Sequence, residues 1–268
     1  MKKLNYEAVA SHITEWLKSY AQKAGASGYV MGVSGGIDSA VVSTLAAKTG
    51  LNLIVLQMPI HQIEEQDGNS EFMINWLREN FSNVSSVKAD LTSTFDTFMK
   101  DRPKRGSDSG DLQHLTEANT RSRLRMITLY YYGQLNGLLV AGTGNKVEDF
   151  GIGFYTKYGD GGVDVSPIAD LMKSEVYELG KYLGIPERIS NRDLNKPTDG
   201  LWSDGRTDED QIGASYDELE WAMNYLAFDT KTELTPRQSK VLEIYKSFNT
   251  RNHHKMDPIP ICSLKTLR

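Results

Sequence analysis

The sequence predicts an α/β fold in three layers, in which a mostly parallel sheet of about five strands lies between helices on both faces. Two observations lead to this prediction. Short apolar segments alternate with segments of helical periodicity through the first half of the chain, as they do where helices connect parallel strands. A glycine-rich turn joins the first apolar segment to a helix, as in Rossmann-like domains. The chain has 268 residues, and we expect a single domain over residues 1–268.

The individual elements follow from the spacing of apolar residues. Apolar residues recur at helical spacing from Tyr6 to Tyr20, so an amphipathic helix should open the chain. Compact apolar segments predict strands at residues 28–33, 53–56, 84–87 and 138–141. Helical spacing predicts further helices at residues 40–48, around 72–77, and at 122–135, 176–183, 215–227 and 236–248.

Three polar segments interrupt this pattern. Residues 100–116 are rich in Gly, Ser, Asp and basic residues, and residues 198–211 are rich in Asp and Gly. Structureless segments of this length are usually functional lids or disordered excursions, and length alone does not separate the two. We expect both segments to close over bound substrates. Residues 251–255 are expected to form an irregular, basic tail.

Composition and charge exclude several classes of protein. The chain is 39% hydrophobic and 24% charged, which is ordinary for a soluble globular protein. No segment approaches the roughly 18 apolar residues of a membrane-spanning helix, and the first residues lack a signal-peptide core. The net charge of −5 gives no general attraction for nucleic acid. The single cysteine, Cys262, fits a reducing, cytoplasmic compartment, and we expect it to be semi-buried rather than a nucleophile.

The strongest chemical signal is the turn after the first strand, Ser34-Gly35-Gly36-Ile37-Asp38-Ser39. Paired glycines let the backbone approach a phosphate closely, and the N-terminus of the following helix offers N–H donors to the same anion. The serine hydroxyls add donors, and Asp38 offers a hard oxygen ligand for Mg²⁺. In the alternative interpretation Asp38 or Ser39 only caps the helix. The full strand–turn–helix context favours the phosphate site.

The turn lacks the lysine, followed by Ser or Thr, that ends a kinase-type phosphate loop. It resembles instead the loop of the ATP pyrophosphatase superfamily, whose members cleave ATP between the α and β phosphates. Within that superfamily the sequence is similar to the ammonia-dependent NAD synthetases over nearly the whole chain. Residues 119–126, 142–148, 155–164 and 196–198 carry this similarity, and residues 156–162 are its most specific part.

The resemblance implies which residues form the ATP site. Asp38 and Lys173 would be catalytic, and Asp38 with Glu148 would bind Mg²⁺. Thr143 and Glu148 follow a predicted strand, where ligands bind in open α/β sheets. Simpler interpretations are a solvated loop acid for Glu148 and an ordinary turn residue for Thr198. The implied ATP contacts are Gly32, Val33, Ser34, Gly35, Gly36, Ile37, Asp38, Ser39, Thr143, Lys173 and Thr198.

For the second substrate, deamido-NAD, the resemblance implies contacts with Arg123, Lys157, Asp164, His254 and Lys255. A charged, frayed tail is the alternative interpretation for the last two. The interval from Glu148 to Lys157 is one residue longer than the bacterial family pattern, which leaves the register of residues 149–154 open. The resemblance also implies a homodimer, and the predicted helix at 122–135 is apolar on more than one face, as a helix with a second packing partner would be.

The implied reaction has two steps: the nicotinate carboxylate attacks the α-phosphorus of ATP, and ammonia then displaces AMP. The chain has no Ser/His or Cys/His pattern and no room for a glutaminase domain, so free ammonia is the expected nitrogen source, and a separate partner that supplies it stays open. One alternative is a tRNA-modifying adenylating enzyme, which would want a basic surface and often cysteines. Another is a regulatory nucleotide-binding protein without turnover, against which the joint presence of Asp38, Glu148 and Lys173 argues.

Overall fold

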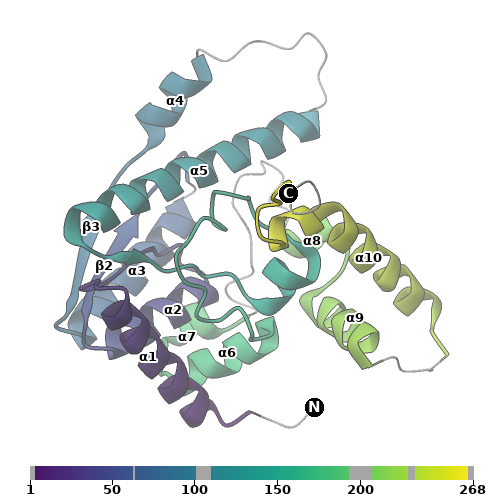
Figure 1. The fold of residues 1–268 in the computed structure, drawn as a ribbon, viewed down its shortest axis with the longest axis horizontal. Coiled ribbons are helices and arrows are strands. Elements are labelled where there is room, and N and C mark those ends of the chain that lie inside the picture. Colours follow the sequence, from purple (N-terminus) through teal and green to yellow (C-terminus); the bar gives the residue numbers. More distant parts are fainter. Residues whose placement is uncertain (1–3, 63, 101–109, 193–206, 229–232, 265–268) are drawn as a thin grey trace.

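The computed structural model describes residues 4–62, 64–100, 110–192, 207–228 and 233–264. At its centre lies a parallel sheet of four strands in the order β3-β2-β1-β4 (Figure 1). The strands are β1 (Gly28–Gly32), β2 (Asn52–Gln57), β3 (Val84–Lys88) and β4 (Leu139–Val140). The chain proceeds outward from β1 to β3 and then returns to the other side of β1 as β4. Open α/β sheets bind ligands outside the strand ends at such a reversal.

Helices cover both faces of the sheet, and each face has its own apolar layer. The helices α1 (Tyr6–Lys23), α2 (Ile37–Lys48), α3 (Glu64–Asn80) and α6 (Lys173–Tyr182) cover the face on which Tyr29 and Met31 are fully buried. The helix α5 (Gly110–Asn136) covers the other face and packs near Val30 and Val140. Helix α2 is buried over most of its length, since it lies between the sheet, α1 and α6.

The C-terminal helices form a second apolar cluster. It combines α8 (Asp208–Ile212), α9 (Tyr216–Phe228) and α10 (Pro236–Met256) with the π-helix η1 (Lys146–Ile152). Helices α9 and α10 lie side by side at the right of Figure 1. Because η1 follows β4 and contributes Val147 and Ile152 to this cluster, it connects the sheet to the C-terminal helices. The short helix α4 (Thr92–Lys100) precedes α5, and the short helix α7 (Glu187–Ser190) follows α6.

The predicted three-layer α/β fold is confirmed, but the sheet has four strands in the described residues rather than about five. Directly after β4, Ala141 forms a single parallel bridge with Val165, a residue further along the chain. This contact lies where a fifth strand would have extended the sheet. One bridge does not make a ladder, so the predicted strand count was too high.

Polar composition misled the prediction of several helices. Helix α4 occupies a stretch in which no helix was predicted, and residues 110–116 belong to α5 rather than to a loop. Residues 208–211 are likewise helical, in α8, and α10 continues through residues 251–255 to Met256 instead of ending in an irregular tail. Most of the remainder of the two predicted lids, residues 101–109 and 198–206, lies outside the described residues.

Two further expectations concern membranes and the cysteine. No helix in the described ranges is long and apolar enough to cross a membrane. Cys262 is exposed, in the extended segment after α10, so the expectation of a semi-buried cysteine was wrong.

Candidate active site

The turn after β1 is held by its own hydroxyl groups. The Oγ atoms of Ser34 and Ser39 lie 3.1 Å apart, and the Ser39 Oγ accepts from the Ser34 N–H and donates to the Gly36 carbonyl. Gly35 has a φ of +85°, and a Cβ there would lie 2.7 Å from the backbone nitrogen of Ser70 in α3, so only glycine fits. Gly36 is the N-cap of α2, and no side chain caps this helix. The first turn of α2 therefore keeps N–H donors for an anion.

This turn lines a cavity of about 970 Å³ outside the carboxyl ends of β1, β2 and β4. It is lined by the ends of these three strands and the segments that follow them, residues 32–39, 56–59 and 141–143. Its volume lies at the upper end of the roughly 300–1,000 Å³ of ordinary ligand pockets, which suits a nucleotide with a second substrate beside it. The predicted ATP residues from Gly32 to Ser39, together with Thr143 and Lys173, are all among its lining residues. Thr198 lies outside the described residues.

A buried cluster of three charges lies in the wall of this cavity. The Lys173 Nζ is 2.5 Å from the Asp38 Oδ2 and 3.0 Å from the Glu148 Oε1, and the lysine side chain is 4% exposed. The Asn145 Nδ2 donates to the Asp38 Oδ1 over 3.2 Å, and the ammonium lies 4.8 Å from the centre of the Tyr216 ring. Helices α2, η1 and α6 each supply one charge, so the cluster joins segments that are distant in the sequence.

Burial and mutual attraction set the protonation of this cluster. Burial lowers the pKa of Lys173, but the charges of Asp38 and Glu148 outweigh that effect and raise the pKa above its usual value. Burial raises the pKa of Asp38, and attraction to Lys173 does not reverse the shift, since the charge of Glu148 also raises it. For Glu148 burial works in the same direction, yet Lys173 and the hydrogen bonds bring its pKa below the usual value. The lysine therefore stays charged, and Glu148 is the more acidic of the two carboxyl groups.

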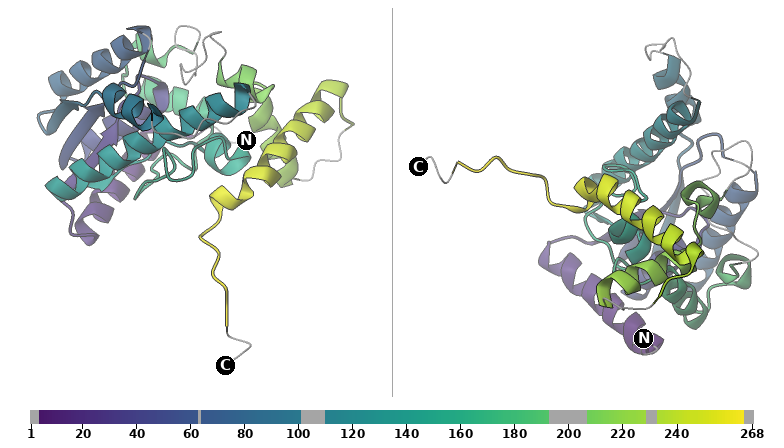
Figure 2. Two further views of the ribbon diagram at one scale, coloured as in Figure 1. Left: turned by 90° about the horizontal axis from the view of Figure 1, so that it is seen from above. Right: turned by 90° about the vertical axis from the view of Figure 1, so that its right-hand side faces the viewer.

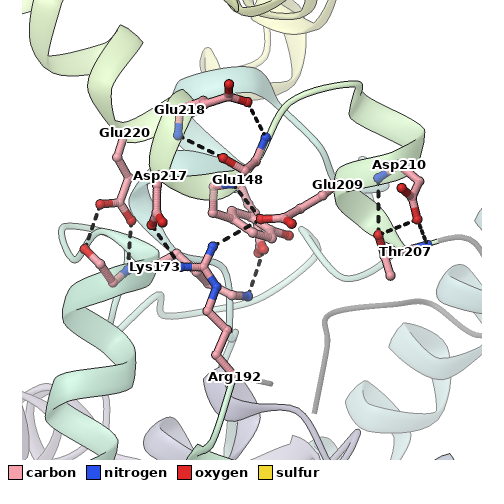
Figure 3. Close-up of polar contacts among 12 residues, drawn as sticks. Glu148, Lys173, Arg192, Thr207, Glu209, Asp210, Asp217, Glu218 and Glu220 are labelled. Atoms are coloured by element: carbon pink, nitrogen blue, oxygen red, sulfur yellow. Dashed lines mark hydrogen bonds and ion pairs between the residues drawn. The ribbon is translucent and has the colours of Figure 1, made fainter. Parts of the chain in front are cut away.

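Lys173 is the first residue of α6, where a cation opposes the helix dipole. A carboxylate offsets this, because Glu220 of α9 accepts from both the N–H and the hydroxyl of Ser174, at 2.8 and 2.7 Å. Close to Glu220 in Figure 3, Arg192 forms ion pairs with Glu209 of α8 at 3.1 Å and with Asp217 of α9 at 2.9 Å. Glu220 thus fastens α9 to the start of α6, next to the charge cluster, and Arg192 links α8 to α9.

The extra residue noted between Glu148 and Lys157 coincides with the π-helix η1. A π turn closes hydrogen bonds over five residues rather than four, so it accommodates one more residue per turn than an α-helix. The helix begins at the N-cap Asn145, whose side chain accepts from the N–H of Glu148 at 3.1 Å. It ends at Gly153, which has a left-handed φ of +61°. Glu148 reaches Lys173 from this helix, and Gly153 leads the chain back to the cavity.

Helix α10 holds the chain that leaves η1 through three side chains on one face, here called the α10 ladder: Asn249, Asn252 and Lys255. They donate to the main-chain carbonyls of Gly151 (2.8 Å), Ile152 (2.8 Å), Gly153 (2.8 Å) and Tyr155 (2.7 Å). A Cβ on Gly153 would lie 2.5 Å from the Asn252 Cβ, so helix and backbone are in direct contact. The ladder therefore fixes the segment that carries Tyr155 into the cavity wall.

Four of the five predicted dinucleotide residues lie together beside this ladder. Arg123 donates to the Lys157 carbonyl at 3.3 Å, and the Lys157 ammonium donates to the His254 carbonyl. Lys255 is the next residue along α10, and burial, with the nearby Arg251 and Arg123, lowers its pKa. In the structure the two lysines thus bind main-chain carbonyls, and contact with a substrate stays a prediction.

Asp164 does not join this group. Its Oδ1 accepts from the Tyr130 hydroxyl at 3.0 Å, and its Oδ2 accepts from the Val140 N–H at 2.8 Å. The carboxylate therefore links β4 to α5. Contact of Asp164 with the dinucleotide stays a prediction.

Sequence reasoning missed Asn145, Tyr216 and Asn252. A signal existed for Asn145, because a cap residue three positions before a glutamate is the spacing of a helix start. No local pattern marks Tyr216 or Asn252, whose positions depend on how α9 and α10 pack against η1.

Known proteins are similar to this chain over most of its length. The chain matches the family model described as NAD synthase over residues 9–258. The NH₃-dependent NAD⁺ synthetase of Methanosarcina acetivorans is 33% identical over 97% of this chain and 100% of the relative. That of Syntrophomonas wolfei is 40% identical over 84% and 85%.

Solved structures share the fold. NMN synthetase from Francisella tularensis superposes with a TM-score of 0.82 at 31% identity, covering 97% of this chain and 100% of that one. The NH₃-dependent NAD synthetase from Campylobacter jejuni, solved in complex with the nitrate ion, gives a TM-score of 0.77 at 24% identity, with the same coverage.

Replacing Lys173 with Met keeps the length of the side chain but leaves Asp38 and Glu148 without their cation. We expect the free energy of unfolding to fall by about 3–5 kcal/mol, the usual cost of leaving buried charges unpaired. Urea denaturation at neutral pH measures the change. The control is Lys240→Met, which removes an exposed lysine 3.3 Å from Glu243 and should cost less than about 1 kcal/mol. Equal losses in the two variants would contradict a stabilising cluster.

Replacing Asn252 with Leu removes the donor to the Ile152 carbonyl. Since one hydrogen bond contributes about 1 kcal/mol, amide hydrogen exchange in residues 151–157 should become roughly five to ten times faster. Exchange followed by mass spectrometry measures this. His253→Ala, which alters an exposed neighbour on α10, is the control and should leave the exchange unchanged. If Asn252→Leu also leaves these peptides unchanged, the ladder does not fix the segment.

Proposed function

The chain belongs to the NAD synthase family, and we propose that it is an ammonia-dependent carbon–nitrogen ligase that converts deamido-NAD to NAD, with release of AMP and pyrophosphate. One observation carries this proposal. The phosphate-binding turn and the Asp38–Lys173–Glu148 cluster line one cavity at the reversal of the strand order. That is where a triphosphate and its charge-neutralising groups must meet.

In the first step, a carboxylate oxygen of the nicotinate forms a bond to the α-phosphorus of ATP, and the bond from this phosphorus to the pyrophosphate oxygen breaks. The N–H groups at the start of α2, with Ser34 and Ser39, would hold the departing pyrophosphate. Lys173 would donate to a phosphate oxygen, since an ammonium has three N–H donors and Asp38 and Glu148 accept from two of them. Charge stabilisation of this kind supplies most of the catalysis in phosphoryl and nucleotidyl transfer.

In the second step, the nitrogen of ammonia bonds to the acyl carbon, AMP leaves with the electrons of the carbon–oxygen bond, and a proton passes from nitrogen to solvent. No covalent bond to the protein forms. The cationic group of Arg123, Lys157 and Lys255 would neutralise the anionic dinucleotide at the other end of the site. An acyl-adenylate is readily hydrolysed, so the site must exclude water between the steps.

Magnesium is the expected metal, and the residues present fit it. The described residues hold no group of three or more His, Cys, Asp or Glu side chains around one point. Mg²⁺ needs no such group, because it is usually bound by one or two carboxylates together with substrate phosphates. Asp38 and Glu148 would be these carboxylates, since both lie within contact of the same ammonium in the cavity wall. Bound there, the metal would act as a Lewis acid that neutralises phosphate charge.

A second candidate substrate is nicotinate mononucleotide, the acid that corresponds to NMN. The likeness to the Francisella tularensis NMN synthetase, at a TM-score of 0.82 and 31% identity, favours testing it. Both acids would undergo the same chemistry at the same carboxylate. They differ only in whether an adenylate occupies the far end of the site.

We also propose a cytoplasmic homodimer. Helix α5 has 27 residues, of which Gly133 is the one classed as buried, although the helix is rich in Leu, Ile, Met and Tyr. Ile127, Tyr131 and Leu135, spaced four apart and 59%, 64% and 67% exposed, form a continuous stripe along it, here called the α5 stripe. A helix with such a second apolar face usually has a second packing partner.

Incubation with ATP, Mg²⁺, ammonium and deamido-NAD should yield NAD, AMP and pyrophosphate in equal amounts, whereas glutamine in place of ammonium should yield almost none.

Asp38→Ala should abolish turnover, because phosphate charge is left uncompensated. Asp170→Ala, which removes a 96% exposed carboxylate, is the control and should be active. Chromatographic measurement of all three products, repeated with nicotinate mononucleotide, identifies the preferred acid. Activity of Asp38→Ala equal to that of the control would refute the assigned site.

In sedimentation equilibrium at micromolar concentration, the protein should behave as a particle of twice its 30.0 kDa chain mass. Ile127→Asp should weaken the dimer at least tenfold, because it places a charge in an apolar contact. Phe228→Asp, at a 68% exposed position at the end of α9, should leave it unchanged. A monomeric wild-type protein would rule the dimer out.

A further inference from the structure

The chain after α10 leaves the folded body as an extended, apolar segment. Residues 258–264 read Pro-Ile-Pro-Ile-Cys-Ser-Leu, and we call them the tail. Ile259, Ile261 and Leu264 are 69%, 88% and 49% exposed. Both views of Figure 2 show the tail pointing away from the body. Apolar side chains this exposed, adjacent in one segment, mark a contact surface rather than a solvated end.

The two prolines keep the tail extended. Pro258 and Pro260 fix their own φ angles, lack N–H donors for a helix, and restrict the residues before them to extended conformations. A chain in this conformation advances about 3.1 Å per residue, so seven residues reach roughly 20 Å. This conformation has three residues per turn, so residues three apart point to the same side, which places Ile261 and Leu264 together. The segment is thus a preformed apolar arm.

The same chain presents a matching surface. The α5 stripe of Ile127, Tyr131 and Leu135 is apolar and exposed. Figure 2 shows that the tail leaves the body on the side where the C-terminal half of α5 lies, yet it points outward rather than across its own α5. A second copy docked on this side by a two-fold axis would present its own α5 to the tail, and each chain would give and receive one arm.

From these observations we propose that the tail of each copy crosses to a second copy of this chain and packs on the partner's α5 stripe. The inference rests on the homodimer proposed above and adds to it a specific exchanged element. Its occupant is a second copy because the tail and the stripe are both apolar, both exposed and on one side of the same chain. The arm also continues directly from α10, whose ladder holds residues 151–155, so the contact ties the subunit interface to the cavity wall.

The single cysteine of the chain lies in the tail, so the unaltered protein can be probed at one point. Cys262 is coupled to a maleimide–benzophenone photo-cross-linker in an equal mixture of ¹⁵N-labelled and unlabelled copies. After irradiation, cross-linked peptides are identified by mass spectrometry. We expect links between a tail of one isotope and α5 peptides of the other. Links confined to one isotope, or to partner peptides outside α5, would overturn the proposal.

A second measurement uses the double variant Ile259→Asp/Ile261→Asp, compared with Phe228→Asp. Sedimentation should show a dimer dissociation constant raised at least tenfold by the tail variant and unchanged by the control. Both substitutions lie in exposed positions, so folding, checked by circular dichroism, should be retained. An unchanged dissociation constant refutes the arm while the dimer stands. A monomeric wild-type protein refutes both, and NAD formation, measured separately, tests the catalytic proposal alone.

Discussion

The buried ion cluster of Asp38, Lys173 and Glu148 is the interaction on which the rest of the site depends. Each member comes from a different element, and Lys173 lies 135 positions from Asp38 in the sequence. A buried charge without its partner is costly, so each of the three elements is constrained to the position that the other two require. The cluster thereby sets where α2 begins beside the phosphate turn, how η1 is oriented and where α6 starts. The same three groups are the ones proposed to act on ATP.

The sequence predicts those parts of the fold that local patterns determine. Strands β1 to β3, helix α1 and the phosphate turn follow from apolar spacing and glycine placement, and all are found where expected. Helices α4, α8 and the polar ends of α5 and α10 were missed because their polar composition resembles that of loops, and the end of α10 also depends on distant partners. The last turns of α10 show this, since residues expected to be frayed are helical with Asn252 and Lys255 bonded to carbonyls about 100 positions away. A window of sequence does not contain such partners.

The site residues also divide into those that local sequence patterns predict and those that they do not. The residues from Gly32 to Ser39 could be assigned because a strand, a turn and a helix in succession specify a phosphate site. The π-helix η1 was not predicted, because one short stretch of i→i+5 bonding leaves no periodic pattern in the sequence. Contact of Asp164 with the dinucleotide stays a prediction, whereas its structural role was not visible in the sequence. Its two carboxylate oxygens accept from the Tyr130 hydroxyl and the Val140 N–H and so link β4 to α5.

Charge explains why an acidic protein can hold two anionic substrates. The chain carries a net charge of −5, so attraction must be local. When both carboxylates are ionised, the cluster has a net charge of −1, which repels a triphosphate on its own. A divalent cation beside Lys173 would make it +1, since Asp38 and Glu148 raise the pKa of the lysine and keep it charged at neutral pH. Without Lys173 the two carboxylates would cancel the divalent cation completely. The lysine thus has two functions: it stabilises the empty site and leaves a positive surplus for phosphate once the metal arrives.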